Sequence, residues 1–155
     1  MKIKIAWIGK TKEAAIQALT DEYLKRISRY TPVEGVAIRD ESALLAACRR
    51  TASAKWAKIS PAGSSTLILM DSRGKQFSSE EFAHFLGNYQ ASNPRPLVFA
   101  VGGADGFSEQ TRSAAQFTLS LGKLTLAHEV ARVVLLEQVY RAFTILKGHP
   151  YHSGH

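Results

Sequence analysis

The sequence predicts a single α/β domain with a mainly parallel sheet and helices on both faces. Short apolar segments alternate along the chain with longer segments in which apolar residues recur at helical spacing. Two of the short segments, 66–70 and 97–101, are almost entirely apolar, as expected for strands at the centre of a parallel sheet. The length of 155 residues suits one compact domain, which we expect to span 1–155.

The first half of the chain contains two strand patterns and two helix patterns. The first strand ends at Gly9, Pro32 ends the first helix, and Gly35 weakens the second strand. In chain order, we expect a strand at 2–8, a helix at 12–29, a strand at 33–38, a helix at about 42–59 and turn material at 61–65.

The second half of the chain continues the alternation. Ser78 and Glu81 are spaced as a capping box, and Ser108 is placed to begin a short helix. We expect strands at 66–70, 97–101 and 117–121, a turn at 71–74, helices after Ser78 and Ser108, and a final helix from 129 to about 146.

The final helix is unusually apolar. Within 130–146, 12 of the 17 residues are apolar or aromatic, so the helix must be covered on more than one side. The second cover is either another copy of the chain, which predicts a homodimer, or further elements of the same monomer.

Charge and composition restrict the partners and the compartment. The formal net charge of +7 favours a polyanion such as RNA or DNA, although a basic protein without such a partner has the same charge. Cys48, the single cysteine, excludes an intrachain disulfide, fits a reducing cytosol and is expected in the core. The first residues are typical of a strand rather than a signal peptide, and no apolar run is long enough to span a bilayer. We therefore expect a cytoplasmic protein with no membrane partner.

Two loops are candidates for ligand binding. Gly102–Gly106 follows a buried strand and precedes a helix, where glycines let the backbone approach a ligand and helix amides bind anions. Its GGxxG spacing differs from the dinucleotide fingerprint, and a tight strand-to-helix turn explains it equally well. The second loop, Leu121–His128, is apolar, which indicates packing against a ligand or partner, or a buried crossover.

The C-terminal segment contains three histidines at 149, 152 and 155. Pro150 and Gly154 disfavour a helix that would place them on one face, and no other ligand cluster lies nearby, so no metal is expected. A flexible tail and a substrate-contacting tail both remain open.

Four segments together resemble the RlmH family of SPOUT-class methyltransferases. They are VGGADGFS (101–108), LSLGKLTLAH (119–128), VARVVLLEQVYRAF (130–143) and HPYH (149–152), and the strand 67–71 with Gly74 and Lys75 also fits. The resemblance implies S-adenosylmethionine as the cofactor, N3 of a pseudouridine in 23S rRNA as the methyl acceptor, and a homodimer. It also implies a C-terminal trefoil knot, with a cofactor-binding part at about 66–155.

The resemblance also implies roles for individual residues. Candidate catalytic residues are His128, as a base or a loop-orienting group, and Tyr151 and His152 in the tail. Candidate RNA-binding residues are Arg132, Arg141 and His155; the two arginines could instead pair with Glu129 and Glu137. Candidate cofactor-binding residues are Met70, Gly103, Gly122, Lys123, Leu124, Thr125, Leu126 and Ala127.

Two positions depart from the family pattern. The second loop runs Thr125-Leu-Ala-His-Glu129 without the family's usual prolines, and Ser153 follows the Tyr-His pair where the family usually has Lys or Arg. Two other functions therefore stay in view: a non-catalytic RNA-binding or ribosome-associated protein, and another nucleotide-dependent α/β enzyme. Because a small domain has little surface for recognising an isolated RNA sequence, we expect the assembled ribosome to be the substrate.

Overall fold

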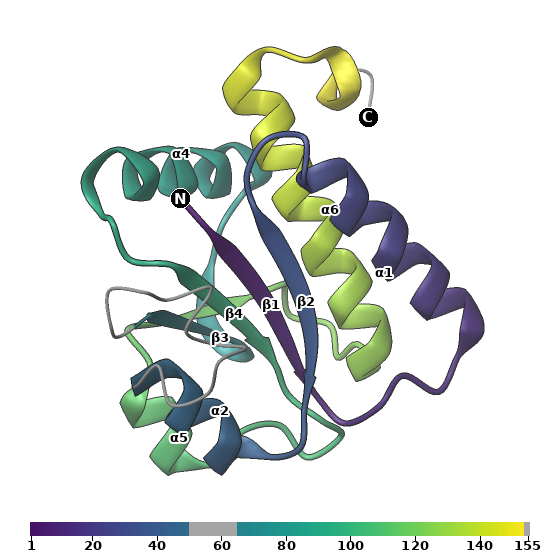
Figure 1. Cartoon of the computed structure of the whole chain (residues 1–155), viewed down its shortest axis with the longest axis vertical. Coiled ribbons are helices and arrows are strands. Elements are labelled where there is room, and N and C mark those ends of the chain that lie inside the picture. Colours follow the sequence, from purple (N-terminus) through teal and green to yellow (C-terminus); the bar gives the residue numbers. More distant parts are fainter. Residues whose placement is uncertain (50–64, 154–155) are drawn as a thin grey trace.

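The computed structural model describes residues 1–49 and 65–153. Its centre is a sheet of five parallel strands in the order β2-β1-β4-β3-β5 (Figure 1). The strands are β1 (Ile3–Ile8), β2 (Val33–Ile38), β3 (Thr66–Gln76), β4 (Leu97–Val101) and β5 (Phe117–Ser120). The helices are α1 (Ala14–Ile27), α2 (Glu41–Arg49), α4 (Ser79–Ser92), α5 (Glu109–Ala114) and α6 (His128–Lys147), and a 3₁₀ turn, η1, covers Pro150–His152.

The sheet separates two layers of helices, as the alternation of strands and helices predicts. Ile3 and Ile5 on one face of β1 pack in a core cluster with residues of α1, α4 and α6. Ala6 on the other face packs with α2 residues and with Phe107, which precedes α5. Figure 1 shows α1 beside α6, and α2 beside α5. The predicted α/β fold class is therefore confirmed.

Most predicted element boundaries agree with the structure to within one or two residues. The capping box is present: Glu81 N–H donates to Ser78 Oγ at 3.0 Å, and Ser78 N–H donates to Glu81 Oε1 at 3.0 Å. Ser108 caps α5 as expected. The predicted second helix begins near its expected start, but its expected part from 50 to 59 and most of the turn at 61–65 lie outside the described residues.

The predicted turn at 71–74 is wrong, because β3 continues through it to Gln76. The ladder between β3 and β5 changes register between Met70 and Lys75. Gly74 permits a close approach rather than a turn, since a Cβ there would lie 2.6 Å from the Thr118 carbonyl carbon. The irregular strand carries Asp71 and Arg73 past the end of the neighbouring strand β4.

The apolar α6 is covered by elements of its own chain. It packs on the sheet and against both α1 and α4. Much of the apolar surface of α6 is therefore buried within one subunit, although Val130 and Leu146 are exposed, and a homodimer needs other support. Cys48 is buried as expected, and burial raises the pKa of its thiol to about 12. Among the described residues, no helix is long and apolar enough to cross a membrane.

Candidate functional site

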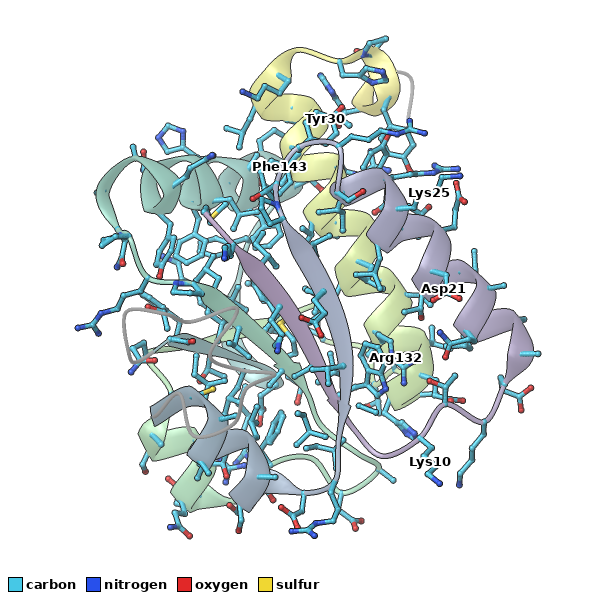
Figure 2. All side chains as sticks on the ribbon, in the orientation of Figure 1. Lys10, Asp21, Lys25, Tyr30, Arg132 and Phe143 are labelled. Atoms are coloured by element: carbon cyan, nitrogen blue, oxygen red, sulfur yellow. The ribbon has the colours of Figure 1, made fainter. Side chains whose placement is uncertain are left out.

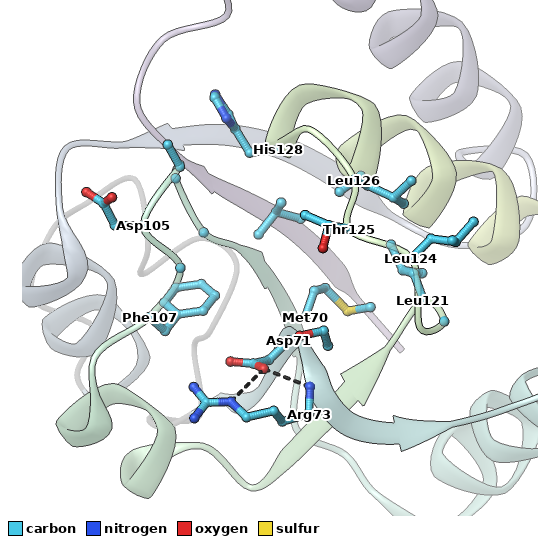
Figure 3. A pocket seen from close by; sticks show the side chains of 18 of the residues that line it. Met70, Asp71, Arg73, Asp105, Phe107, Leu121, Leu124, Thr125, Leu126 and His128 are labelled. Atoms are coloured by element: carbon cyan, nitrogen blue, oxygen red, sulfur yellow. Dashed lines mark hydrogen bonds and ion pairs between the residues drawn. The ribbon is translucent and has the colours of Figure 1, made fainter.

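A cavity of about 360 Å³ opens at the carboxyl ends of β3 and β4 (Figure 3). This edge is where open parallel sheets bind ligands, and the volume suits a small molecule. The wall combines three segments that are far apart in the sequence. They are the part of β3 that extends beyond β4 (the β3 extension, 71–73), the glycine turn after β4 (102–106) and the loop after β5 (121–127). The lining residues are Met70–Arg73, Val101–Phe107, Arg112, Leu121, Gly122, Leu124–Leu126, His128 and Ala131.

The glycine turn has two positions where only glycine fits well. A Cβ on Gly102 would lie 3.2 Å from the Phe107 ring and 3.3 Å from the Gly106 backbone. Gly106 has a φ of +71°, and its N–H donates to the Gly103 carbonyl at 3.0 Å. Gly103 is different, because a Cβ there would meet nothing nearer than Ile8 Cγ2 at 4.0 Å. Gly103 thus borders open space on the cavity wall.

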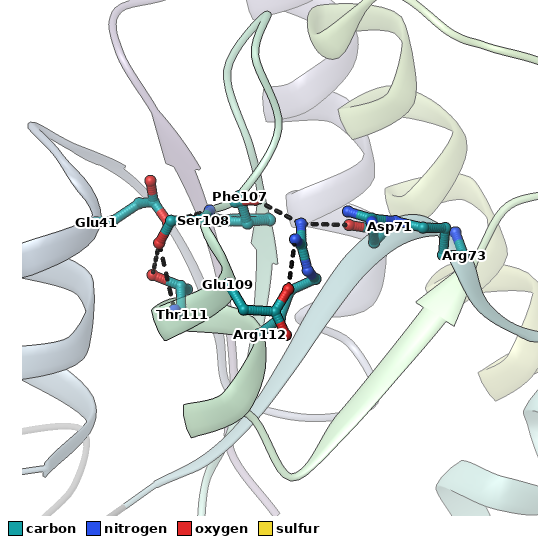
Figure 4. A network of polar contacts seen from close by, with 8 residues as sticks. All are labelled: Glu41, Asp71, Arg73, Phe107, Ser108, Glu109, Thr111 and Arg112. Carbon is teal, nitrogen blue, oxygen red and sulfur yellow. Dashed lines mark hydrogen bonds and ion pairs between the residues drawn. The ribbon is translucent and has the colours of Figure 1, made fainter.

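Polar contacts behind the cavity fix the glycine turn to the neighbouring helices (Figure 4). Glu41 Oε1 accepts hydrogen bonds from Ser108 N–H at 2.8 Å and from Ser108 Oγ at 3.0 Å. Hydrogen bonding from Thr111, opposed by burial and assisted by Ser108, holds the pKa of Glu41 below its usual value. Arg112 Nη1 donates to the Phe107 carbonyl at 2.6 Å. The turn is therefore held at its end by both α2 and α5.

Asp71 is a cavity-lining carboxylate that the sequence did not single out. It accepts from the backbone N–H of Arg73 at 2.9 Å, and its Oδ2 lies 3.7 Å from Arg112 Nη1. Burial opposes ionisation, but the hydrogen bonds and positive charges of Arg73 and Arg112 leave the pKa of Asp71 below its usual value. One ionised carboxylate and two arginines therefore border this side of the cavity.

The loop after β5 is shaped by a side chain that the sequence analysis did not identify. Ser120 Oγ accepts from Gly122 N–H at 3.0 Å and donates to the Gly122 carbonyl at 2.9 Å. Gly122 has a φ of +126°, a conformation that favours glycine. The loop presents Leu124, which is 82% exposed, and ends at Ala127, the N-cap residue of α6.

The structure brings most of the predicted cofactor-binding residues together. Six of the eight line the same cavity, namely Met70, Gly103, Gly122, Leu124, Thr125 and Leu126. Lys123 and Ala127 belong to the same loop but do not line the cavity. This placement agrees with the predicted site and leaves the individual contacts as proposals.

The three predicted catalytic residues do not meet within one chain. His128 begins α6 and lines the cavity. Tyr151 and His152 follow the other end of this 20-residue helix, which at 1.5 Å per residue is about 30 Å long. Tyr151 packs on Tyr140 with ring centroids 4.7 Å apart, and its hydroxyl lies 3.2 Å from Glu137 Oε1. Burial, with contacts to Tyr23 and Glu137, raises the pKa of Tyr151.

The predicted RNA-binding residues also lie in different environments. Arg141 Nε donates to Glu137 Oε1 at 3.0 Å, so this arginine adopts the alternative pairing. Arg132 is 1% exposed, and its Nη1 donates to Thr11 Oγ1 at 2.6 Å. A buried guanidinium presents no surface to RNA, so we withdraw the phosphate-binding assignment of Arg132. His155 lies outside the described residues.

The cavity suits S-adenosylmethionine on its own features. Apolar side chains from β3 and the loop after β5 can cover an adenine ring. Open space at Gly103 leaves room for a ligand close to the main chain.

Comparison with known proteins identifies the family. The family model described as "Predicted SPOUT methyltransferase" matches residues 1–152. The chain belongs to the SPOUT methyltransferase family. Ribosomal RNA large subunit methyltransferase H of Koribacter versatilis is 53% identical over 155 residues, covering 100% of both chains. The protein of the same name from Geobacter metallireducens is 44% identical over 154 residues, covering 99% of this chain and 100% of the relative.

Solved structures show the same fold at low sequence identity. A probable methylase family protein from Haemophilus influenzae has a TM-score of 0.57 at 14% identity, covering 96% of this chain and 69% of that chain. The SpoU methyltransferase AviRb from Streptomyces viridochromogenes has a TM-score of 0.55 at 14% identity, covering 95% of this chain and 61% of that chain. The predicted family, methyltransferase activity and S-adenosylmethionine cofactor are confirmed at the level of the family.

Proposed function

We propose that this SPOUT methyltransferase transfers a methyl group from S-adenosylmethionine to N3 of a pseudouridine in 23S rRNA. The observation that carries the proposal is the 360 Å³ cavity, in which three separate segments of the predicted cofactor site meet. Relatives of 42–53% identity that span nearly the whole chain are named ribosomal RNA large subunit methyltransferase H, which supports large-subunit rRNA as the substrate.

The chain's own residues bind and orient the reactants. When bound, the cofactor supplies an activated methyl group, so positioning is the main requirement on the protein. Met70, Leu124 and Leu126 would hold the adenine and exclude water, while Gly103 and Gly122, which lack side chains, would let the ligand lie close to the main chain. N3 of the acceptor carries a proton at neutral pH, and we assign its removal to an imidazole nitrogen of His128 at the cavity wall.

We propose a homodimer in which the tail of one subunit (149–155) completes the cavity of the other. Within one chain, the length of α6 separates the tail from the cavity. Leu19 of α1, Leu124 of the loop and Val130 of α6 are large apolar side chains that are 44%, 82% and 43% exposed. Burial of these side chains by a second subunit would be favourable.

The same proposal places the protein in the cytoplasm, on the assembled ribosome. The net charge of +7 suits an rRNA surface, and one small domain offers little area for sequence readout. We also propose that the cofactor-binding part, about 66–155, forms the trefoil knot of its class. Methylation of ribosomal particles but not of a short naked rRNA hairpin is the expected result, and efficient methylation of the hairpin would contradict the requirement for the particle.

Calorimetric titration with S-adenosylmethionine, with NAD as the control ligand, tests the cofactor directly. We expect binding of S-adenosylmethionine in the micromolar range and none of NAD. Absence of cofactor binding, both free and on ribosomes, would favour a non-catalytic RNA-binding protein. Binding of NAD instead would favour a different nucleotide-dependent α/β enzyme.

A further inference from the structure

Arg132 is a fully buried cation whose position the methyl-transfer proposal does not explain. It lies in the second turn of α6 and is 1% exposed. Burial lowers the pKa of its guanidinium, and the nearby charge of Glu129 opposes this effect. Burying a cation is costly unless its environment compensates. The contacts of Arg132 therefore indicate the role of the buried charge.

The contacts of Arg132 come from β1 and from the connection between β1 and α1. Its guanidinium carbon lies 4.0 Å from the centroid of the Trp7 ring, in a cation–π arrangement. Its Nη1 donates to Thr11 Oγ1 at 2.6 Å. These partners are an aromatic ring and a hydroxyl rather than a carboxylate, so they constrain the direction of the planar guanidinium more than they neutralise its charge.

A second contact joins the same two segments. The backbone N–H of Lys12 donates to Glu129 Oε1 at 2.6 Å. Thr11 and Lys12 in the β1–α1 connection thus hold Arg132 and Glu129 near the start of α6. In Figure 2, Arg132 lies at this end of α6, close to the segment that carries Lys10.

These contacts lie directly behind the cavity. His128 and Ala131, which lie just before Glu129 and just before Arg132, both line the cavity. The last residue of β1, Ile8, is the side chain nearest to the open side of Gly103. The end of β1 and its following connection therefore contact the start of α6, which continues the loop after β5, although neither that connection nor Trp7 lines the cavity.

We propose that Arg132 is a positioning residue for cofactor binding. Through Trp7 and Thr11, it fixes the first turns of α6, and with them the loop Gly122–Ala127 and His128, in the arrangement that accepts S-adenosylmethionine. The inference rests on the proposed function. Fixing the loop before the cofactor arrives reduces the ordering cost of binding. The loop Gly122–Ala127 contains no proline to restrict its own backbone, so contacts from outside the loop are needed to hold its conformation.

The decisive variant is Arg132→Met, which keeps a long side chain but removes the charge and both directed contacts. Replacement of a buried charge by an apolar side chain is often tolerated or even stabilising, so we expect the Tm to change by no more than about 4 °C. We expect the Kd for S-adenosylmethionine to rise about tenfold, because the loop must be ordered on binding. The KM for the cofactor should rise similarly, with kcat at saturating cofactor little changed.

Three further variants complete the experiment. Arg132→Lys keeps the charge without the planar fork and should recover only part of the affinity. Thr11→Val removes one hydroxyl and should raise the Kd about threefold. Arg95→Met, an exposed arginine in the connection before β4, is the matched control and should leave the Kd unchanged. Amides of 122–131 should exchange hydrogen faster in Arg132→Met than in the wild type, with the strands of the sheet unaffected.

The outcomes separate this inference from the proposed function. A folded Arg132→Met protein with the wild-type Kd for S-adenosylmethionine would overturn the positioning role. An unchanged Kd together with a loss of kcat on ribosomes would also overturn it, because that result would assign Arg132 a role in RNA binding instead. If Arg132→Met does not fold, an unchanged Kd in Thr11→Val overturns the inference. A wild-type protein that binds no cofactor refutes the proposed function itself.

Discussion

The glycines around the cavity differ in how strongly the fold requires the absence of a side chain. Gly102 and Gly106 are constrained by the fold, the first by the nearby Phe107 ring and the second by its positive φ. Gly103 has neither constraint, and a Cβ there meets only Ile8 Cγ2 at 4.0 Å. The fold therefore does not require glycine at position 103, and the proposed cofactor site supplies a reason for it.

This difference predicts that Gly103→Val blocks cofactor binding without unfolding the protein. The added side chain would occupy space in the cavity, so we expect the Kd for S-adenosylmethionine to rise at least about tenfold. The Tm should shift by less than about 4 °C. Calorimetric titration and a thermal melt measure the two effects. Ala91→Val, at an exposed position in α4, is the control. A Gly103→Val protein with normal affinity for S-adenosylmethionine would show that Gly103 is not part of the cofactor site.

Cys48 gives a second prediction at the same scale. Cys48 is 6% exposed, and burial raises the pKa of its thiol to about 12, so almost no thiolate forms at neutral pH. We expect a disulfide-exchange reagent to react with Cys48 in urea and to react far more slowly with the native protein. Fast reaction in the native state at pH 8 would show that this part of the core opens readily.

At the scale of elements, Glu41 at the start of α2 connects α2 to the N-terminus of α5. The carboxylate accepts two hydrogen bonds from Ser108, which itself caps α5 through Thr111. The pKa of Glu41 is lowered in the folded protein, so ionised Glu41 stabilises the fold. This stability is fully present above the unfolded pKa of about 4.3 and is lost as the pH falls through the lower folded pKa.

Glu41→Gln should therefore lower the free energy of unfolding by about 1–2 kcal/mol at pH 7, because charged hydrogen bonds are stronger than neutral ones. The difference between the wild type and the variant should shrink as the pH falls below about 4. Urea unfolding at pH 7 and at pH 3.5 measures both quantities. A difference that is independent of pH would show that the charge of Glu41 contributes nothing.

The sequence predicted the elements well where local chemistry determines them, and less well where distant residues meet. The Ser78–Glu81 capping box needed only four adjacent positions, and it is present in the structure. Gly74 suggested a turn, but it serves the close approach of β3 to Thr118, a contact that no local pattern reveals. Gly35 likewise makes room for Trp7 and Leu24, so a glycine that weakens the strand locally is required by packing.

The same limit explains which parts of the candidate site were predicted. Glycine turns and an apolar loop stand out in sequence, and five predicted residues of these segments line one cavity together with Met70 of β3. Asp71 and Ser120 lie in segments that resemble the family, but their contacts could not be predicted, because their partners are set by the extension of β3 and by the local loop conformation. Arg132 was a candidate RNA-binding residue of the final helix, and only the fold shows that it is buried against Trp7.

At the scale of the whole molecule, the separation of the cavity from the tail has a consequence that a mixture of two variants can test. Gly103→Val has a blocked cavity and an intact tail, whereas a chain that ends after Gly148 has an intact cavity and no tail. In a homodimer that shares its sites, a mixed dimer of the two holds one cavity and one tail that can act together. If subunits mix randomly, half of the dimers are mixed and each has one complete site, so about a quarter of the wild-type activity should return.

Each variant alone should be inactive on ribosomes, for different reasons. The shortened chain should still bind S-adenosylmethionine, since the cavity lies at the other end of α6 and its lining is unchanged. If the tail instead serves its own subunit, neither partner in a mixed dimer holds a complete site, and mixing restores nothing. Recovery of activity on mixing therefore requires both a dimer and a tail that crosses to the partner. If both chains are folded and mixing restores no activity, the shared site is rejected.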